Sequence, residues 1–185
     1  EIRNIALEGN GVYELTYIHN LSHTLHMLTQ KTVNKTIGQV VNNQLKELIG
    51  EDITTVEPTQ RNKFIDYIES FSDEVNLKIC ILIDCSGSMK HKLSEAIDSL
   101  VDLMKSLEIR SGTTEISVIG FPGRSKEDTF ILSSFDDDID LQKKLKEIKV
   151  RGVTPTGPAI RFAVDYLNGE EKEILQEGIF SENIV

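Results

Sequence analysis

The chain has 185 residues, and its 30 acidic and 20 basic residues give a formal net charge of −10. So acidic a chain argues against nucleic-acid binding, because contacts with phosphates need a basic face. The length suits one ordinary domain, or one domain with an appendage. No apolar run approaches the roughly 18 residues that a membrane span needs. No signal peptide is recognised, although a removed one stays compatible with the sequence.

Residues 1–76 are predicted to form a hairpin followed by helices. Two apolar-rich segments, 2–7 and 12–18, flank Asn10-Gly11, and Asn-Gly between such segments is typical of a β-hairpin. Apolar residues recur at helical spacing over residues 21–49, where β-branched residues and a glycine predict one helix or two with a break. Gly50 suits the end of this helix. A third helix is expected over residues 59–72.

From residue 77 onward, predicted strands and helices alternate. The strands are expected at 77–83, 115–121 and 129–135, and the helices at 92–107, 141–148 and 155–167. The first strand is continuously apolar, as in a parallel strand that is covered on both faces. This alternation predicts a doubly wound, mostly parallel, Rossmann-like α/β sheet. We expect two domains, residues 1–76 and residues 77–185.

Three oxygen-bearing side chains follow the first predicted strand at every second position. They are Asp84, Ser86 and Ser88, in the sequence Asp-Cys-Ser-Gly-Ser, and a predicted helix comes next. Mg²⁺ and Mn²⁺ prefer oxygen donors, and open α/β folds place ligands beyond the carboxyl ends of their strands. The alternative is a plain turn with a helix N-cap, since these residue types are favoured there as well.

This turn resembles the metal-ion-dependent adhesion site of von Willebrand factor type A (VWA) domains. Residues 152–157, Gly-Val-Thr-Pro-Thr-Gly, look like that family's second metal-binding loop. The resemblance implies a VWA-like fold, with Thr154 as a fourth ligand; alternatively, Thr154 or Thr156 is only a helix N-cap. The family normally supplies a further Asp after a later strand. Residues 170–185 do not match that part of the pattern, so the domain is expected to be incomplete and its fifth ligand to be absent.

The resemblance implies a protein-binding module that is not an enzyme. A Mg²⁺ or Mn²⁺ ion held by one carboxylate and several hydroxyls keeps positive charge, so it can accept an Asp or Glu from a partner protein. The alternative is a subunit of an intracellular complex driven by an AAA+ ATPase, since metal chelatases contain subunits that resemble this family. The acidic chain and its free cysteines favour a cytoplasmic protein.

Catalysis by the chain itself fits the sequence less well. Cys80 and Cys85 are predicted to point to opposite faces of a strand and not to form a disulfide with each other. A catalytic thiol at Cys85, with His91 nearby, is a weaker alternative to a buried cysteine. Ser86 is not part of a Gly-x-Ser-x-Gly elbow. An aspartyl-phosphate mechanism at Asp84 is disfavoured, because the usual second carboxylate two residues later is a serine.

Two further clusters have simpler interpretations. His19, His23 and His26 share one face of a predicted helix and could bind Zn²⁺ or Ni²⁺, but a solvated polar face explains them better. The acidic run 136–138 lacks the spacing of a Ca²⁺ loop and is expected to be a solvated loop.

The predicted sheet has strands on only one side of residues 77–83. The other edge would expose unpaired backbone groups, which favours aggregation or recruitment of another strand. We therefore expect another segment to pair there: residues 2–18, a second copy of the chain, or, as the favoured candidate, a partner-supplied or missing segment. That segment should also bring the absent Asp ligand.

Overall fold

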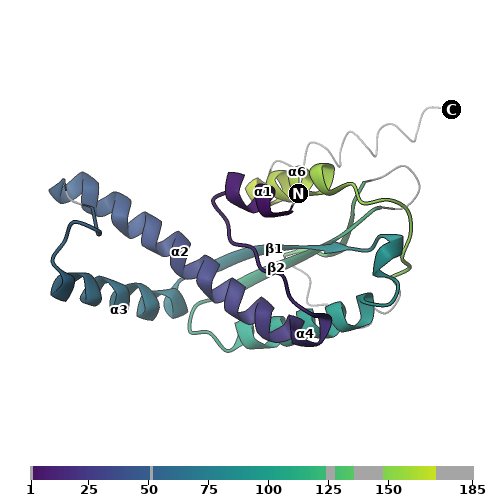
Figure 1. The fold of residues 1–185 in the computed structure, drawn as a ribbon, viewed down its shortest axis with the longest axis horizontal. Helices are drawn as coiled ribbons and strands as arrows, with labels where there is room; N and C mark the ends of the chain where they lie inside the picture. The colour runs from purple at the N-terminus through teal and green to yellow at the C-terminus, as the bar shows by residue number, and fades with distance from the viewer. Residues whose placement is uncertain (1, 51, 124–127, 136–147, 170–185) are drawn as a thin grey trace. The chain divides into compact units, whose positions relative to one another are not determined.

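The computed structural model describes residues 2–50, 52–123, 128–135 and 148–169. The chain divides into two compact units, residues 1–76 with 98–113 and residues 77–97 with 114–185 (Figure 1). The expected domains 1–76 and 77–185 stay a prediction.

The predicted N-terminal hairpin is wrong, because the chain begins with a helix, α1 (Ile2–Glu8). The N–H of Gly9 donates to Ile5 O at 3.0 Å, and the N–H of Gly11 donates to Ala6 O at 2.6 Å. Between them, Asn10 has a left-handed φ of 52°. A left-handed residue that closes the last carbonyls of a helix is a usual helix ending, and Asn and Gly suit it as well as they suit a hairpin turn. Residues 11–17 have no regular secondary structure.

Residues 21–49 form one continuous helix rather than two. A short 3₁₀ turn, η1 (Ile18–Asn20), leads into α2 (Leu21–Ile49). Gly50 ends α2 with a φ of 74°, as predicted, and its N–H donates to Lys46 O. The glycine within the helix does not break it, because intrinsic propensity is a weak determinant beside tertiary packing.

The third helix, α3 (Pro58–Glu74), packs against α2 and begins with its proline in the first turn. Gly38 of α2 lies at this contact: a Cβ there would be 3.7 Å from Ile68 Cδ1 of α3, an ordinary van der Waals distance. The loop between the two helices is held by side chains. The N–H of Ile53 donates to Asn42 Oδ1 at 2.8 Å, and Lys46 Nζ lies 2.7 Å from Asp52 Oδ2.

The later part of helix α4 (Leu93–Glu108) completes the first unit. Ser106 Oγ lies 2.9 Å from His26 Nδ1, and Ser22 Oγ donates to Asp102 Oδ2 at 3.3 Å. Two polar contacts therefore tie the first half of α2 to α4, across 80 residues of sequence in each case.

The second unit is built on a three-stranded sheet in the order β1-β2-β3. β1 (Leu77–Asp84) and β2 (Thr114–Phe121) are parallel, with Leu77 opposite Thr114 and Asp84 opposite Phe121. β3 (Phe130–Ser133) runs antiparallel to β2. The predicted fold class, a doubly wound α/β fold with a mostly parallel sheet, is confirmed, with a helical N-terminal extension in place of the hairpin. Most of the predicted helix 141–148 lies outside the described residues.

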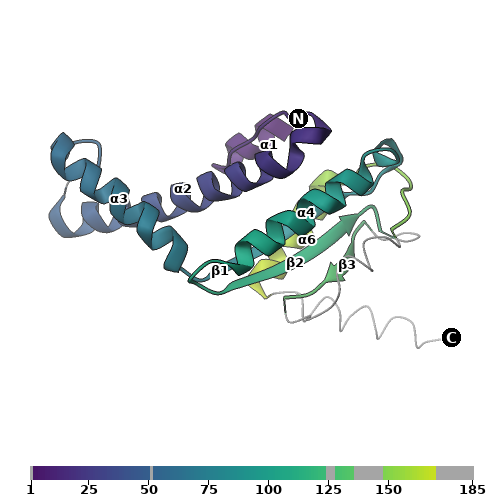
Figure 2. The ribbon, with the colours of Figure 1, turned by 90° about the horizontal axis from the view of Figure 1, so that it is seen from below.

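Helix α6 (Thr156–Asn168) packs on β1 and β2, and it lies on the opposite face of the sheet from the start of α4 (Figure 1 and Figure 2). Its buried residues at this contact are small, Ala159 and Ala163. Val118 and Ile119 of β2 have no exposed surface. The core of this unit therefore centres on β2, which has strands on both sides.

Two features of the described chain bear on its surroundings. Among the described residues, β1 has a strand neighbour on one side only, and the expectation that another segment pairs along its other edge stays a prediction. None of the helices in the described part of the chain is long and apolar enough to cross a membrane.

Candidate metal centre

Asp84 is the last residue of β1, at the carboxyl end of a parallel strand. The next residue leaves the sheet while still attached to it, because the N–H of Cys85 donates to Phe121 O at 2.7 Å. The Asp84 carboxylate is held in turn: the N–H of Ser86 donates to its Oδ1 at 2.8 Å. This hydrogen bond uses one of the two carboxylate oxygens and fixes the orientation of the group.

The hydroxyls of Ser86 and Ser88 lie side by side, with their Oγ atoms 3.1 Å apart. Ser86 is buried, 2% exposed, whereas Ser88 is exposed. Ser86 directly precedes the 3₁₀ segment η2 (Gly87–Met89), and Ser88 lies within it. Two oxygens at adjacent corners of an octahedron around Mg²⁺, each about 2.1 Å from the ion, are about 3.0 Å apart. The spacing of the two hydroxyls therefore fits a shared hard cation.

The second predicted loop is attached to the first. The N–H of Arg151 donates to Cys85 O at 3.0 Å. Gly152 has a left-handed φ of 63°. Its carbonyl oxygen lies close to Gly87 of the first loop: a Cβ added to Gly87 would be 3.9 Å from it. Thr154 follows two residues later and is exposed. Both loops lie at the same end of the sheet (Figure 1 and Figure 2).

The hydroxyls of the two loops do not cap η2 or α6. Ser86 precedes η2 and Pro155 precedes α6, and neither helix start has a side-chain capping hydrogen bond. The alternative in which Thr154 or Thr156 is the N-cap of α6 is therefore wrong, because α6 begins at Thr156 itself. The structure brings Asp84, Ser86 and Ser88 together; for Thr154 it places the loop but gives no side-chain contact with the other three.

The Cys85 thiol is not an activated nucleophile. Its side chain is 1% exposed, and Sγ lies 3.6 Å from Ile83 O. Burial, reinforced by the neighbouring Asp84 carboxylate, raises the pKa of Cys85 to about 11, against weaker opposing effects that include the charge of Arg151. The thiol is therefore protonated at neutral pH, and the catalytic interpretation of Cys85 is wrong.

We predict that this buried thiol makes the fold sensitive to alkaline pH. A pKa raised from 9.0 to about 11 contributes stability that is complete below pH 9 and is lost as the pH rises through about 11. Between these values, the free energy of unfolding should fall less steeply for Cys85→Ala than for the unmodified protein. Denaturant unfolding across this range measures the difference. Cys80→Ala is the control, and an equal change of slope in both variants would contradict the assignment.

The three N-terminal histidines do not form a metal site. His19 belongs to η1 and stacks on Tyr17, while His26 of α2 contacts Ser106. No group of three or more His, Cys, Asp or Glu side chains within the described ranges is placed to hold a metal ion. The histidine metal hypothesis is therefore wrong. The acidic run 136–138 lies outside the described residues.

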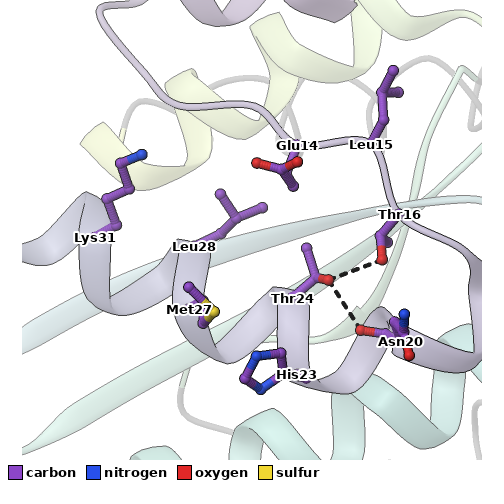
Figure 3. Close-up of a pocket in the computed structure, with 9 residues that line it drawn as sticks. All are labelled: Glu14, Leu15, Thr16, Asn20, His23, Thr24, Met27, Leu28 and Lys31. Carbon is purple, nitrogen blue, oxygen red and sulfur yellow. Dashed lines mark hydrogen bonds between the residues drawn. The ribbon is translucent and has the colours of Figure 1, made fainter.

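A pocket in the first unit was missed from the sequence. It has a volume of about 430 Å³ and lies between the irregular segment 11–17 and α2 (Figure 3). On one side of it, Thr24 Oγ1 donates to Asn20 O at 3.0 Å and lies 2.9 Å from Thr16 Oγ1, at hydrogen-bonding distance. Its lining is mixed: Glu14, Leu15, Thr16, Asn20, His23, Thr24, Met27, Leu28 and Lys31. No sequence signal marked it, because it depends on where the irregular segment lies along the helix.

An α/β unit with an Asp-x-Ser-x-Ser turn beyond its first strand, and a Thr-Pro-Thr loop tethered beside it, defines the class of the protein. The chain belongs to the von Willebrand factor type A domain family, whose model matches residues 78–178. It is 34% identical over 165 residues to the uncharacterized protein YabS of Bacillus subtilis (strain 168), covering 88% of this chain and 67% of that one.

A solved structure resembles the fold as well. The crystal structure of an uncharacterized protein from Alicyclobacillus acidocaldarius matches with a TM-score of 0.81 and 33% identity. The match covers 90% of this chain and 72% of that chain. These relatives establish the family and the fold of the chain. Because both are described as uncharacterized, they assign it no activity.

Proposed function

We propose that this VWA domain is a protein-binding module that depends on a divalent cation. The observation that carries the proposal is the paired hydroxyls of Ser86 and Ser88, 3.1 Å apart, beside the oriented carboxylate of Asp84. All the predicted donors are oxygens, and only one of them is charged, which suits a hard cation such as Mg²⁺ or Mn²⁺. Thr154 is proposed as a fourth ligand from the tethered second loop.

The mechanism follows from charge. A divalent cation held by one carboxylate and neutral hydroxyls keeps net positive charge, so it favours one more anionic oxygen. Asp84, Ser86 and Ser88 would hold the ion, and an Asp or Glu of the partner protein would complete its coordination. The hydrogen bond from the Ser86 N–H keeps the Asp84 carboxylate turned toward this turn. The partner interface would then require the ion.

Binding rather than catalysis is supported by the surrounding residues. The nearest nucleophile candidate, Cys85, is buried and keeps its proton at neutral pH. The described turn from Asp84 to Ser88 contains no second carboxylate for acid–base chemistry. Any catalysis would therefore be carried by partner chains, as in the alternative of an ATPase-driven complex.

The sequence-based expectation of a further strand beside β1, which has a strand neighbour on one side only among the described residues, extends the proposal to a second contact. Asp84 ends this strand, so a strand pairing along β1 would finish beside the metal loop. A segment supplied by a partner, a second copy or further chain could therefore cover the edge and bring a fifth ligand at once. Amide hydrogen exchange tests whether the second edge of β1 is paired. If the amides on both edges of β1 are protected from exchange in the isolated chain, a partner-supplied strand is contradicted.

The test is recovery of partners from a native extract with Mg²⁺ present or removed by EDTA. The unmodified domain should capture a partner that binds through the ion only when Mg²⁺ is present. The Asp84→Ala variant should capture it neither with Mg²⁺ nor with EDTA. Recovery of an ATPase would select the ATPase-complex alternative. A complex that survives EDTA and Asp84→Ala unchanged would contradict the bridging role of the ion.

A further inference from the structure

The two loops of the candidate metal centre carry a local excess of positive charge. In the described segments 84–92 and 148–157, Asp84 is the one acidic residue. The same segments contain four cationic side chains, all exposed: Lys90, Lys92, Lys149 and Arg151. We refer to these four residues as the basic rim. It contrasts with a chain whose net charge is −10, so the rim is a local reversal of the overall charge.

The backbone positions of the basic rim lie in the two loops that carry the predicted ligands. Lys90 caps η2, its N–H reaching Gly87 O at 3.4 Å, so it follows Ser88 within one turn. Arg151 is fixed by its own N–H to Cys85 O at 3.0 Å. Gly87 and Gly152 approach each other where the two loops meet. The basic residues are therefore contributed by two segments that lie far apart in the sequence and are joined by a hydrogen bond next to the metal loop.

An exposed apolar side chain stands on the same surface. Val153, between Gly152 and Thr154, is 80% exposed. The second loop therefore presents a hydrophobic tip beside cationic side chains, a combination found at protein interfaces, where apolar contacts are surrounded by polar ones. The local charge and the apolar tip together restrict what this surface fits.

We propose that the basic rim selects an acidic segment of a protein partner, in which additional carboxylates flank the one that binds the ion. This inference rests on the proposed cation-dependent function and adds the chemistry of the partner. Individual exposed ion pairs contribute little to affinity. Several charges of one sign on a surface nevertheless raise the association rate of an oppositely charged partner, and salt weakens this effect strongly. The net negative charge of the chain disfavours such a segment on average, and the rim is a local exception that would orient its approach.

Nucleic acid is the other polyanion that a basic rim could attract. Protein is favoured because the rest of the chain is acidic and repels a long uniform polyanion. A short peptide can place a few carboxylates on the rim without contacting the acidic surface elsewhere on the chain. The exposed Val153 also suits a protein segment.

The experiment uses the full chain with Mg²⁺ and two labelled peptides, followed by fluorescence anisotropy at low and high NaCl. One peptide carries a single Asp among Gly and Ser; the other carries the same Asp flanked by Glu. At low salt the Glu-flanked peptide should bind about tenfold more tightly, as a few exposed ion pairs together would give. The advantage should shrink at high salt.

Charge-matched variants assign the effect to the rim. Lys90→Gln, Lys92→Gln and Arg151→Gln combined should remove the advantage and leave Mg²⁺-dependent binding of the single-Asp peptide. The control variant replaces three exposed lysines of the first unit: Lys31→Gln, Lys63→Gln and Lys105→Gln. This variant should still bind the Glu-flanked peptide more tightly than the single-Asp peptide.

Three outcomes would overturn the inference. Equal affinity for the two peptides, with binding still dependent on Mg²⁺, would reject the rim and leave the proposed function standing. If Mg²⁺ promotes the binding of neither peptide, or if Asp84→Ala leaves peptide binding unchanged, the proposed function itself is contradicted. If a single-stranded oligonucleotide binds more tightly than the Glu-flanked peptide, and this binding is lost in the rim variant, nucleic acid is the partner class and the inference is overturned.

Discussion

Asp84→Ala should abolish the binding of Mg²⁺ and Mn²⁺ by this chain. Asp84 is the only anionic donor among the four predicted ligands, so its removal leaves neutral hydroxyls that cannot offset the dehydration of a divalent cation. Ser86→Ala and Ser88→Ala should weaken binding by less, because each removes one neutral donor and leaves the carboxylate. Isothermal titration calorimetry with Mn²⁺ measures all three variants.

The control is Asp98→Asn, which removes one exposed negative charge from α4 without touching the loop. It should leave the Mn²⁺ affinity close to that of the unmodified protein, which separates loss of a ligand from loss of overall negative charge. Asp84→Asn tests the charge at constant size and should lose binding as Asp84→Ala does. An unchanged Mn²⁺ affinity in Asp84→Ala would show that the site is elsewhere.

Ile119→Ala should strongly destabilise the second unit. Ile119 has no exposed surface and lies in β2, the strand with neighbours on both sides. Replacing a fully buried isoleucine by alanine costs about 2–5 kcal/mol, from lost burial and the cavity that remains. Against a typical free energy of unfolding of about 5–15 kcal/mol, this is a large fraction. Urea unfolding followed by circular dichroism measures it.

The matched control lies directly across the sheet. Ile131 of β3 pairs with Ile119 in register but is 38% exposed. Ile131→Ala removes the same atoms from a partly solvated position and should cost clearly less than Ile119→Ala. Equal losses from the two substitutions would contradict the assignment of the core to β2.

The sequence and the structure agree best where local and tertiary preferences coincide. The apolar run that forms β1 could only be a buried strand or a buried helix, and its length with the turn behind it indicated a strand. The stripe of α4 and the left-handed glycine after α2 were likewise local signals. The antiparallel direction of β3 was not predictable in the same way, because a strand carries no local mark of its direction.

The N-terminal segment shows the opposite case. Asn10-Gly11 was interpreted as a hairpin turn, but the same left-handed preference of Asn and Gly also closes a helix, and here it ends α1. The following segment, 11–17, is apolar enough for a strand yet has no strand partner within the described residues. Strand pairing is a contact between distant segments, so composition alone does not decide it.

The sequence by itself determined the donor set of the candidate site. The residue types and their alternate spacing after a buried strand specify oxygen donors on one turn, and this depends only on local geometry. The tertiary structure decided the rest: it oriented the Asp84 carboxylate, set the two serine hydroxyls 3.1 Å apart and attached the second loop through Arg151 and Cys85. The attachment of the second loop is a backbone hydrogen bond between segments more than sixty residues apart, whose partner the fold selects. The Asp84 and serine contacts are local to the turn, which the hydrogen bond from the Cys85 N–H to Phe121 O holds against β2.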